Sequence, residues 1–312
     1  MKIIVTGALG HIGSFVVRNL ANEFNGSEIV MIDNLITQRY ASLFNLPTTG
    51  RFRFLEVDVR SVDIRTIIEG GDAVIHLAAM TDAAGSFDKA ELVENNNYQG
   101  TLAVAEACAD TDTRLIALSS TSVYGTQEAV VSEECTSEEL KPQSPYAITK
   151  LKEENLVRTL SAQKRLRAVS CRFGTIFGTS PGMRFHTAVN KFCWQAVMGH
   201  PVTVWRTAYE QKRPYLDLGD ASRAISFILR EDLFDGRIYN VLTLNATVRQ
   251  IVETIKEFVP DLKVIFVDSP IMNQLSYEVS TDRFTSAGFK FTGDLRQGIG
   301  ETIALLRQAN TV

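Results

Sequence analysis

The sequence predicts an α/β fold with a doubly wound parallel sheet, and three observations carry that prediction. Short runs of β-branched and aliphatic residues alternate with helical patterns through the first half of the chain. A glycine-rich segment, residues 6–13, follows the first of these runs and opens the first helical pattern. From about Gly174 onward, longer loops rich in Thr, Ser, Pro and Arg appear, which predicts a smaller α/β cap built onto the sheet.

The expected strands are short apolar runs, and helices are expected between and after them. Apolar residues at helical spacing over 12–24 predict the crossover helix between the first two strands, and the same spacing over 248–259 predicts a helix of the cap. The strands are expected at residues 3–5, 28–32, 52–57, 73–77, 115–118 and 168–171.

Composition bounds the class of protein. The chain has 312 residues, 45% of them hydrophobic and 22% charged, and its net charge is −4. A soluble globular protein is indicated, and neither nucleic acid nor a membrane is expected as a partner. Residues 1–6 run directly into the glycine-rich segment, leaving no room for a signal peptide, and no apolar run approaches the roughly 20 residues that span a bilayer. We therefore expect a cytoplasmic protein.

The 4 cysteines show neither C-x-x-C spacing nor paired histidines. We expect Cys108, Cys135, Cys171 and Cys193 to be buried free thiols, and we expect no metal site.

The glycine-rich segment has the context of a dinucleotide site. Its glycines permit a tight turn and let a diphosphate approach the N-terminus of the following helix. Asp33 ends the second expected strand, where a carboxylate accepts hydrogen bonds from an adenosine ribose and repels a 2′-phosphate. This favours NAD over NADP. Alternatively, Asp33 serves only to cap a turn with Asn34. The nearby Arg39 could bind a 2′-phosphate, so NADP remains an alternative cofactor.

A tyrosine and a lysine are placed for acid–base chemistry. Ser144 is a good helix N-cap and Pro145 suits the first helical position, so Tyr146 and Lys150 are expected four residues apart on one helical face. Tyrosine is a poor base because its reference pKa is about 10, but a cation one turn away favours the phenolate. Taken alone, the same spacing also arises by chance in many helices.

Further motifs follow one another in a fixed order. They are T-G-x-x-G-x-x-G at 6–13, Asp33-Asn34, Asp58-Val59-Arg60, His76-Leu77-Ala78-Ala79, Asn97 to Thr101, S-S-x-x-V-Y-G at 119–125 and Tyr-x-x-x-Lys at 146–150. Together they resemble the extended short-chain dehydrogenase/reductase family, in the nucleotide-sugar epimerase and dehydratase group that includes UDP-galactose 4-epimerase. The resemblance covers nearly the whole chain and implies a Rossmann sheet with a C-terminal substrate-binding cap.

The resemblance implies roles for individual residues. Ser120 is the expected catalytic hydroxyl, Tyr146 the base, and Lys150 the group that lowers the tyrosine pKa and holds the cofactor ribose. His76 lies on an apolar strand end, where we expect a hydrogen-bonded core histidine. The implied cofactor contacts are Gly7, Gly10, His11, Ile12, Gly13, Asp33, Asn34, Leu35, Asp58, Val59, Leu77, Ala78, Ala79, Asn97, Leu118, Tyr146, Lys150 and Phe173.

Departures from the family pattern narrow the reaction. The 4,6-dehydratases carry Asp and Glu after the catalytic hydroxyl, where this chain has Thr121 and Ser122. Hydroxyl groups cannot replace that carboxyl pair in water elimination, so dehydration is disfavoured. Reductases of the GDP-fucose synthase type fit poorly too, because Asp33 argues against NADPH.

The resemblance also implies substrate contacts. Arg213 matches the arginine that binds the substrate diphosphate, although it is also suited to a solvated surface. No arginine occurs in 262–281, where the family often supplies a second one, so we expect Arg184 and His186 to compensate. Trp205 suits stacking on a nucleobase or a place in the core. The remaining expected contacts are Ser120, Thr121, Thr175 and Tyr277.

These inferences predict an NAD-dependent nucleotide-sugar 4-epimerase that acts through a transient 4-keto sugar. Two alternatives stay open: a nucleotide-sugar 4-dehydrogenase that releases the keto sugar, and a catalytically silent NAD(H)-binding sensor. We expect residues 1–173, completed by about 213–242, to form the NAD-binding unit, and 174–212 with 243–312 to form the cap. The resemblance further implies a homodimer.

Overall fold

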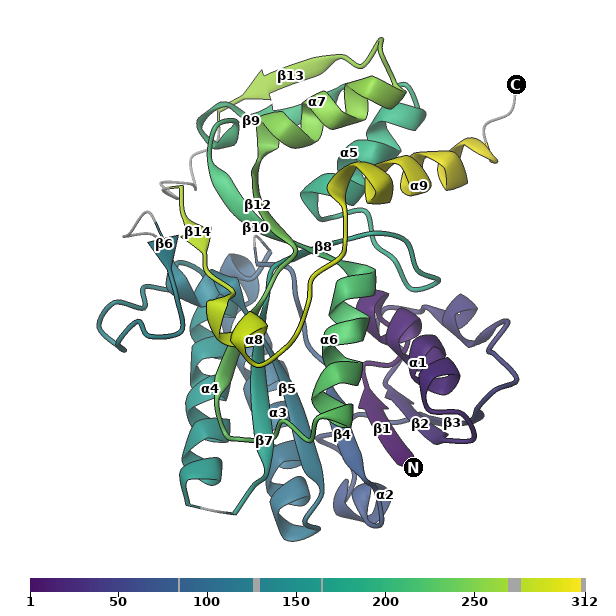
Figure 1. Cartoon of the computed structure of the whole chain (residues 1–312), viewed down its shortest axis with the longest axis vertical. Coiled ribbons are helices and arrows are strands. Elements are labelled where there is room, and N and C mark those ends of the chain that lie inside the picture. Colours follow the sequence, from purple (N-terminus) through teal and green to yellow (C-terminus); the bar gives the residue numbers. More distant parts are fainter. Residues whose placement is uncertain (84, 126–129, 164, 269–275, 310–312) are drawn as a thin grey trace.

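A seven-stranded parallel sheet forms the centre of the molecule (Figure 1). The computed structural model describes residues 1–83, 85–125, 130–163, 165–268 and 276–309. The strand order is β11-β7-β5-β4-β1-β2-β3, which confirms the predicted doubly wound parallel fold. The strands are β1 (Lys2–Thr6), β2 (Glu28–Asp33), β3 (Arg51–Glu56), β4 (Ala73–His76), β5 (Arg114–Ser120), β7 (Ala168–Phe173) and β11 (Ile238–Val241).

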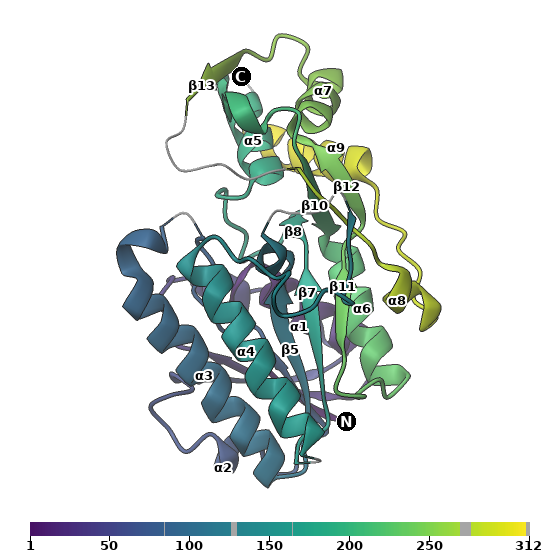
Figure 2. The same ribbon diagram turned by 90° about the vertical axis from the view of Figure 1, so that its left-hand side faces the viewer.

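Helices cover both faces of this sheet (Figure 2). One face packs against α1 and α6, and the other against α2, α3 and α4. Because both faces are covered, the inner strands are almost continuously buried and apolar, as the sequence runs predict. The helices are α1 (His11–Glu23), α2 (Arg65–Ile68), α3 (Ala90–Asp110), α4 (Pro145–Ala162) and α6 (Leu218–Arg230).

The cap combines small sheets with a separate group of helices. Strand β10 (Lys212–Asp217) lies between β8 (Thr175–Phe177) and β12 (Leu244–Thr247), and β9 (Val202–Trp205) pairs with β13 (Val264–Val267). Short β6 (Val130–Val131) and β14 (Glu278–Val279) pair beside them. The cap helices are α5 (Ala188–Val197), α7 (Val248–Phe258) and α9 (Leu295–Arg307), whereas α8 (Asp282–Ser286) packs against β11 and places Phe284 in the core of the large sheet. The short 3-10 helices are η1 (Tyr40–Leu43), η2 (Phe87–Lys89), η3 (Thr121–Tyr124) and η4 (Arg206–Ala208).

The sequence determines the start of α7 locally. The Thr247 hydroxyl accepts a hydrogen bond from the backbone N–H of Gln250 at 3.1 Å, and the Gln250 side-chain oxygen accepts one from the Thr247 N–H at 2.8 Å. This capping box satisfies two N–H groups that a helix start otherwise leaves unpaired. The apolar stripe of α7 then packs into the core of the cap.

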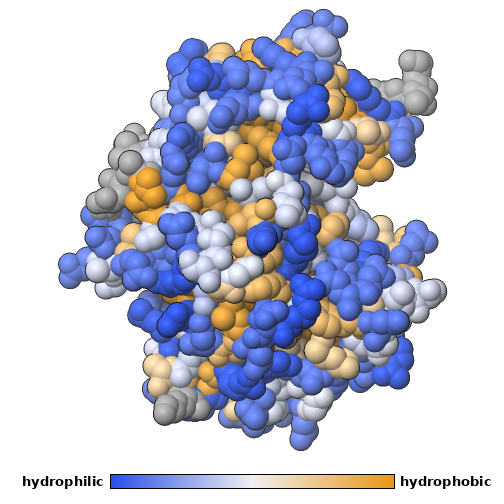
Figure 3. Space-filling view, viewed as in Figure 1, coloured by the Kyte–Doolittle hydropathy of each residue, from blue (hydrophilic) through white to orange (hydrophobic). Residues whose placement is uncertain are grey.

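The chain passes between sheet and cap more than once. Residues 213–242 begin in the small sheet as β10, return to the large layer as α6, and end as its edge strand β11. The domain boundaries named above remain a prediction. In Figure 3, hydrophobic side chains gather on the visible surface between cap and sheet, while the periphery is mostly hydrophilic.

Thiol burial differs at one position from the expectation. Cys108, Cys171 and Cys193 are buried, whereas Cys135 is only partly buried because it lies in a turn, with its N–H on the Ser132 carbonyl, outside any strand or helix. In the described part of the chain, no helix has the length and apolar character required to cross a bilayer.

Candidate active site

A cavity of about 490 Å³ opens at the carboxyl ends of the central strands, where the strand order reverses between β1 and β4. Such reversals create a crevice at the sheet edge, the usual ligand site in open α/β sheets. The predicted cofactor residues that line it are Gly7, Gly10, His11, Ile12, Gly13, Asp33, Asn34, Asp58, Val59, Leu77, Ala78, Ala79, Leu118, Tyr146, Lys150 and Phe173.

The glycine-rich turn is pressed against neighbouring backbone. Gly7 has a φ of 65°, and a Cβ on it would lie 2.7 Å from the backbone of Leu77 and Ala78. A Cβ on Gly13 would lie 2.3 Å from the Gly7 carbonyl oxygen. Any side chain would therefore force the turn away from β4 and close the cradle above the helix start. These residues fit a dinucleotide diphosphate at the N-terminus of α1.

Asp33 caps a local turn and also lines the cavity, and its contact with a cofactor ribose stays a prediction. Its Oδ2 accepts the Leu9 N–H at 3.0 Å, which orders the glycine-rich turn, and its Oδ1 accepts the Leu35 N–H at 3.0 Å in a local turn. Asp33 nevertheless lines the cavity, and each carboxylate oxygen can accept a second hydrogen bond. Asn34 donates to Asp58 at 3.1 Å, and Arg60 also binds Asp58, so the strand ends are tied together.

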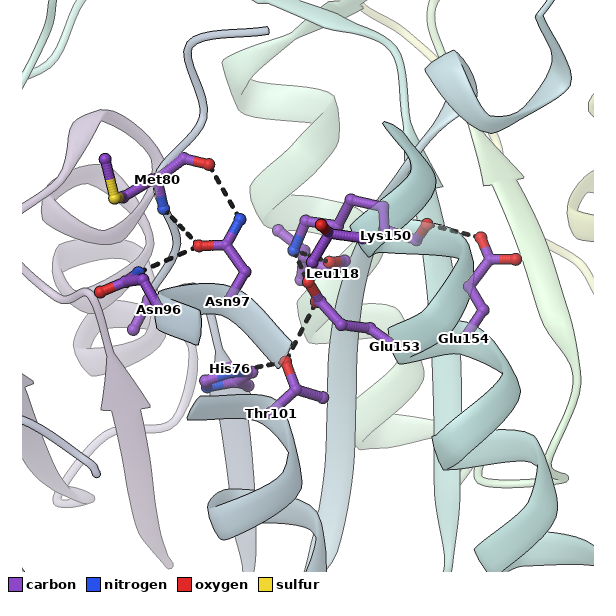
Figure 4. A network of polar contacts seen from close by, with 12 residues as sticks. His76, Met80, Asn96, Asn97, Thr101, Leu118, Lys150, Glu153 and Glu154 are labelled. Carbon is purple, nitrogen blue, oxygen red and sulfur yellow. Dashed lines mark hydrogen bonds and ion pairs between the residues drawn. The ribbon is translucent and has the colours of Figure 1, made fainter. Parts of the chain in front are cut away.

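Two predicted cofactor residues lie behind the cavity wall. Asn97 holds Met80 from both sides, accepting its N–H at 2.7 Å and donating to its carbonyl at 2.9 Å (Figure 4). The backbone of Leu35 closes the Asp33 turn with a φ of 55°. Neither side chain lines the cavity, so we expect both to act on the cofactor through the segments they position.

Ser120, Tyr146 and Lys150 lie on one wall of the cavity. Helix α4 begins as predicted, with Ser144 capping it through a 3.2 Å hydrogen bond and Pro145 in its first turn. The Lys150 ammonium lies 6.0 Å from the centre of the Tyr146 ring, one helical turn away. The Ser120 hydroxyl lies near enough to the Tyr146 phenol to lower its pKa.

The neighbours of Tyr146 act in opposite directions on its pKa. The pKa of the phenol is raised overall, because burial is the largest effect; the Glu153 carboxylate also raises it, whereas Lys150, Ser120 and Arg184 lower it, so the expected net lowering by Lys150 is not observed. Burial also disfavours the charged form of Lys150, but Glu153 and then Tyr146 outweigh that effect and leave the lysine pKa raised. Lys150 is therefore a permanent cation beside the phenol, the arrangement that favours a phenolate.

Glu153 connects Lys150 to a buried polar network (Figure 4). The Lys150 ammonium donates to Glu153 Oε2 and to the Leu118 carbonyl, each at 2.9 Å. Thr101 donates to the same Glu153 oxygen at 3.0 Å and lies 3.1 Å from His76 Nε2. Both charged side chains are only 6% exposed, and Glu153 Oε1 is buried with no partner among the described residues. The carboxylate thus holds Lys150 at the cavity wall.

His76 is a hydrogen-bonded core histidine, as predicted. Its Nδ1 lies 2.7 Å from the Thr6 hydroxyl, whose oxygen also accepts the Ala78 N–H at 3.2 Å. Because the Thr101 hydroxyl donates to Glu153, we assign the ring proton to Nε2, pointing at Thr101. Burial, reinforced by Lys150, lowers the His76 pKa to about 3, so the ring is neutral.

A second buried ion pair fixes α4 against the sheet. Arg172 on β7 binds Glu154 through two hydrogen bonds of 2.8 and 2.7 Å, and Ser119 donates to the same carboxylate at 2.5 Å. Glu153 and Glu154 therefore face different elements: one holds the lysine, and the other holds the strands. This packing holds α4, which carries Tyr146, against β5, which ends at Ser120.

Seven of the eight predicted substrate residues fall into two groups. Ser120, Thr175, Arg184 and His186 line the cavity. Thr121, Arg213 and Tyr277 form a chain beside it, in which Tyr277 donates to the Thr121 carbonyl at 3.3 Å and the Arg213 guanidinium lies 5.3 Å from the Tyr277 ring centre. The Thr121 hydroxyl donates to the backbone and does not line the cavity. Residues 269–275, within the arginine-free stretch, lie outside the described residues.

Trp205 ends the edge strand β9 and is 39% exposed, so the core alternative for this residue is wrong. It pairs with Val267 and does not line the cavity, so its role in substrate binding stays a prediction.

Several residues of the site escaped sequence reasoning. Glu153 belongs to none of the recognised motifs. The only signal in the sequence is its position three residues after Lys150 on the same predicted helix, a spacing that permits an ion pair. Thr81 and Asp82 line the cavity from a loop whose sequence has no distinguishing pattern, whereas Ser122 belongs to the predicted motif at 119–125. The Ser122 hydroxyl is buried without a partner in the described residues and is available to a bound molecule.

Comparisons with known proteins agree with this geometry. Residues 3–241 match the model of the NAD dependent epimerase/dehydratase family. The chain is 29% identical over 250 residues to an uncharacterised UDP-glucose epimerase, YtcB, of Bacillus subtilis, covering 77% of this chain and 76% of the relative. It is 27% identical over 317 residues to RHM2 of Arabidopsis thaliana, a trifunctional UDP-glucose 4,6-dehydratase, epimerase and reductase, covering 97% of this chain but 46% of that one.

Among solved structures, UDP-glucuronic acid 4-epimerase from Bacillus cereus, in complex with UDP-glucuronic acid and NAD, superposes with a TM-score of 0.88 at 25% identity. The match covers 99% of this chain and 100% of that one.

Proposed function

The chain belongs to the NAD-dependent epimerase/dehydratase family, and from that premise we propose that it is a nucleotide-sugar 4-epimerase acting through a transient 4-keto sugar. One observation carries the proposal: Ser120, Tyr146 and Lys150 share the wall of the cavity that begins at the glycine-rich turn. We place the sugar in the crevice between the NAD-binding unit, residues 1–173 with 213–242, and the cap.

The proposed chemistry assigns one task to each group. NAD, when bound, supplies a hydride acceptor and later a hydride donor. Tyr146 takes the proton of the sugar 4-hydroxyl while the C4 hydrogen leaves as hydride, and Ser120 holds the same oxygen. Lys150 stabilises the phenolate. The keto sugar then turns in the site and regains hydride on its other face, and Tyr146 returns the proton to O4. The product is the C4 epimer, with no net oxidation.

Water elimination, one activity of the Arabidopsis relative, stays disfavoured for this chain. Thr121 and Ser122 supply hydroxyl groups where that chemistry needs an acid and a base of moderate pKa. The 4-dehydrogenase and the silent sensor remain the alternatives, because both share the cofactor site.

We also propose that the protein is a homodimer assembled through α3 and α4. Three large apolar side chains near the starts of these helices, Phe87, Leu92 and Ile148, are exposed in the single chain. Burial in a partner would remove them from water.

A substrate panel tests the proposed reaction. Purified protein incubated with UDP-, dTDP-, GDP- and CDP-hexoses, with no cofactor added beyond what it carries, should convert one nucleotide class to a mixture of C4 epimers, identified by NMR. Accumulation of NADH in step with a free keto sugar would instead identify a 4-dehydrogenase. Cofactor binding without any conversion would favour the silent sensor.

The Glu153→Gln variant should shift the pH dependence of catalysis. The Glu153 carboxylate raises the pKa of Tyr146, so its removal leaves the Lys150 charge less compensated and lowers that pKa. The phenolate then persists to lower pH, and the acidic limb of the kcat/KM profile should move to lower pH. Glu94→Gln, which removes one partner of the exposed Lys152 pair, is the matched control and should leave the profile in place. An unchanged limb in Glu153→Gln would contradict the electrostatic role.

A further inference from the structure

Residues 179–187, here called the roof segment, lie directly on the glycine-rich turn although they follow it by more than 160 positions in the sequence. The Gly182 N–H donates to Ser14 Oγ at 2.9 Å, and Ser180 Oγ lies 3.1 Å from His11 Nδ1. Arg39 donates to the Gly182 carbonyl at 2.8 Å. The roof segment is thus bound to the start of α1 and to the loop after β2.

The contact between roof and turn involves the two backbones themselves. A Cβ on Gly182 would lie 2.2 Å from the Leu9 carbonyl oxygen and 2.5 Å from that of Gly10. These are rigid backbone atoms, so no side chain fits at Gly182 unless the roof moves away. On the other side of the glycine-rich turn, Gly7 and Gly13 are packed against backbone just as tightly.

This closure gathers basic side chains in one cavity. Four of them come from the helix start, from the loop after β2 and from the roof segment: His11, Arg39, Arg184 and His186. The cavity is also lined by the acidic residues Asp33, Asp58 and Asp82 and by the basic residues Arg60, His76 and Lys150.

The pKa values of these groups reflect their crowding. Burial and then the Arg39, His186 and Arg184 charges lower the His11 pKa to about 4. Burial and Arg184 lower the Arg39 pKa to about 10, against the opposing effect of Asp33. The two histidines are therefore neutral near pH 7, and the charges that converge in these partly buried surroundings are those of Arg39 and Arg184, an arrangement that an anion between them would stabilise.

Arg184 is directed across the cavity. Its Nη2 donates to the Thr81 hydroxyl and lies 3.2 Å from His186 Nε2, while its Nε is buried with no partner among the residues that the structure describes. It lies close enough to Tyr146 for each charge to affect the other. Arg184 therefore lies between the catalytic tyrosine and the glycine-rich turn.

We propose that the roof segment is part of the cofactor site, with Arg184 and Arg39 binding the cofactor diphosphate from the side opposite the glycine-rich turn. This assigns Arg184 to the cofactor in place of the substrate diphosphate. In this arrangement the two arginines bind the diphosphate oxygens from one side, and the N–H groups at the start of α1 bind them from the other. Cofactor bound in this way stays in place between two half-reactions, a consequence that rests on the proposed 4-epimerase function and favours it over a dehydrogenase, which must exchange NADH for NAD.

Cofactor binding, measured without any sugar, tests this assignment. Arg184→Ala should bind NAD about 10- to 100-fold more weakly in calorimetric titration and should lose cofactor during purification. Arg184→Lys should lie between the two, because it keeps the charge but not the two-pronged geometry. Gly182→Ala should also release NAD faster by displacing the roof. Arg296→Ala, which breaks an exposed ion pair on α9 remote from the cavity lining, is the control and should bind NAD as the unmodified protein does.

Unchanged NAD affinity in Arg184→Ala would overturn the proposal, most directly if KM for a nucleotide sugar rose at the same time, since Arg184 would then be a substrate ligand. Thermal unfolding of each variant without cofactor identifies any loss of folding. If Arg184→Ala unfolds, Arg184→Gln and Arg184→Lys decide the question. Because the titration needs no substrate, failure of the 4-epimerase proposal would leave its result unaffected.

Discussion

Tyr146→Phe should lower turnover on the nucleotide sugar by about 10²- to 10⁴-fold, the range typical of general base catalysis. The substitution removes the one group proposed to take the substrate proton, but it keeps the ring that packs at the start of α4. NAD binding should survive, because the glycine-rich turn and Lys150 remain. Single-turnover reduction of the bound cofactor, followed by absorbance, separates the chemical step from binding.

Tyr239→Phe provides the matched control for this loss. It also removes a phenolic hydroxyl, one that donates to Asp235 at 2.6 Å on the edge strand β11, outside the cavity lining. Its turnover should stay close to that of the unmodified protein. Near-normal turnover in Tyr146→Phe would show that another group takes the proton.

Lys150→Met should impair both catalysis and NAD binding, and it should do so more severely than Tyr146→Phe. Without the ammonium, the pKa of the buried Tyr146 rises and the proposed ribose contact disappears. The variant also leaves the Glu153 carboxylate buried without its cation, and breaking a buried pair in this way typically costs about 3–5 kcal/mol of stability. Denaturant unfolding and NAD titration measure the two effects separately.

The double variant Lys150→Met with Glu153→Gln distinguishes stability from chemistry. Removing the unpaired carboxylate should restore most of the lost unfolding free energy, while activity and NAD affinity should stay low. Recovery of activity along with stability would mean that Lys150 serves the fold and not the reaction.

Sequence reasoning succeeded where the controlling interactions are local. The Ser144 cap and Pro145 determine where α4 begins, and helical geometry then places Tyr146 and Lys150 on one face. The glycine-rich turn follows from the absence of side chains at its tightest positions. Alternation of apolar runs and helical patterns predicted the parallel sheet, because strands covered on both faces must be apolar throughout.

Other features could not be predicted, because the orientation or exposure of a side chain does not follow from the residues next to it in the sequence. Thr121 follows Ser120 directly, yet its hydroxyl turns to the Phe173 carbonyl and away from the cavity. Trp205 ends an edge strand, where the exposure of a side chain depends on which other segments pack against it. In each case the neighbours that decide the outcome belong to distant parts of the chain.

The sequence by itself therefore determined the fold, the glycine-rich turn and the spacing of Tyr146 and Lys150. Hydrogen bonds and side-chain periodicity within a few residues specify these features. Only the tertiary structure decided that Glu153 binds Lys150 within the His76–Thr101 network and that Gly182 brings Arg184 onto the glycine-rich turn. Parallel strands place their carboxyl ends at one edge of the sheet, so residues far apart in the chain meet there, and their charges interact through a buried, weakly screening interior.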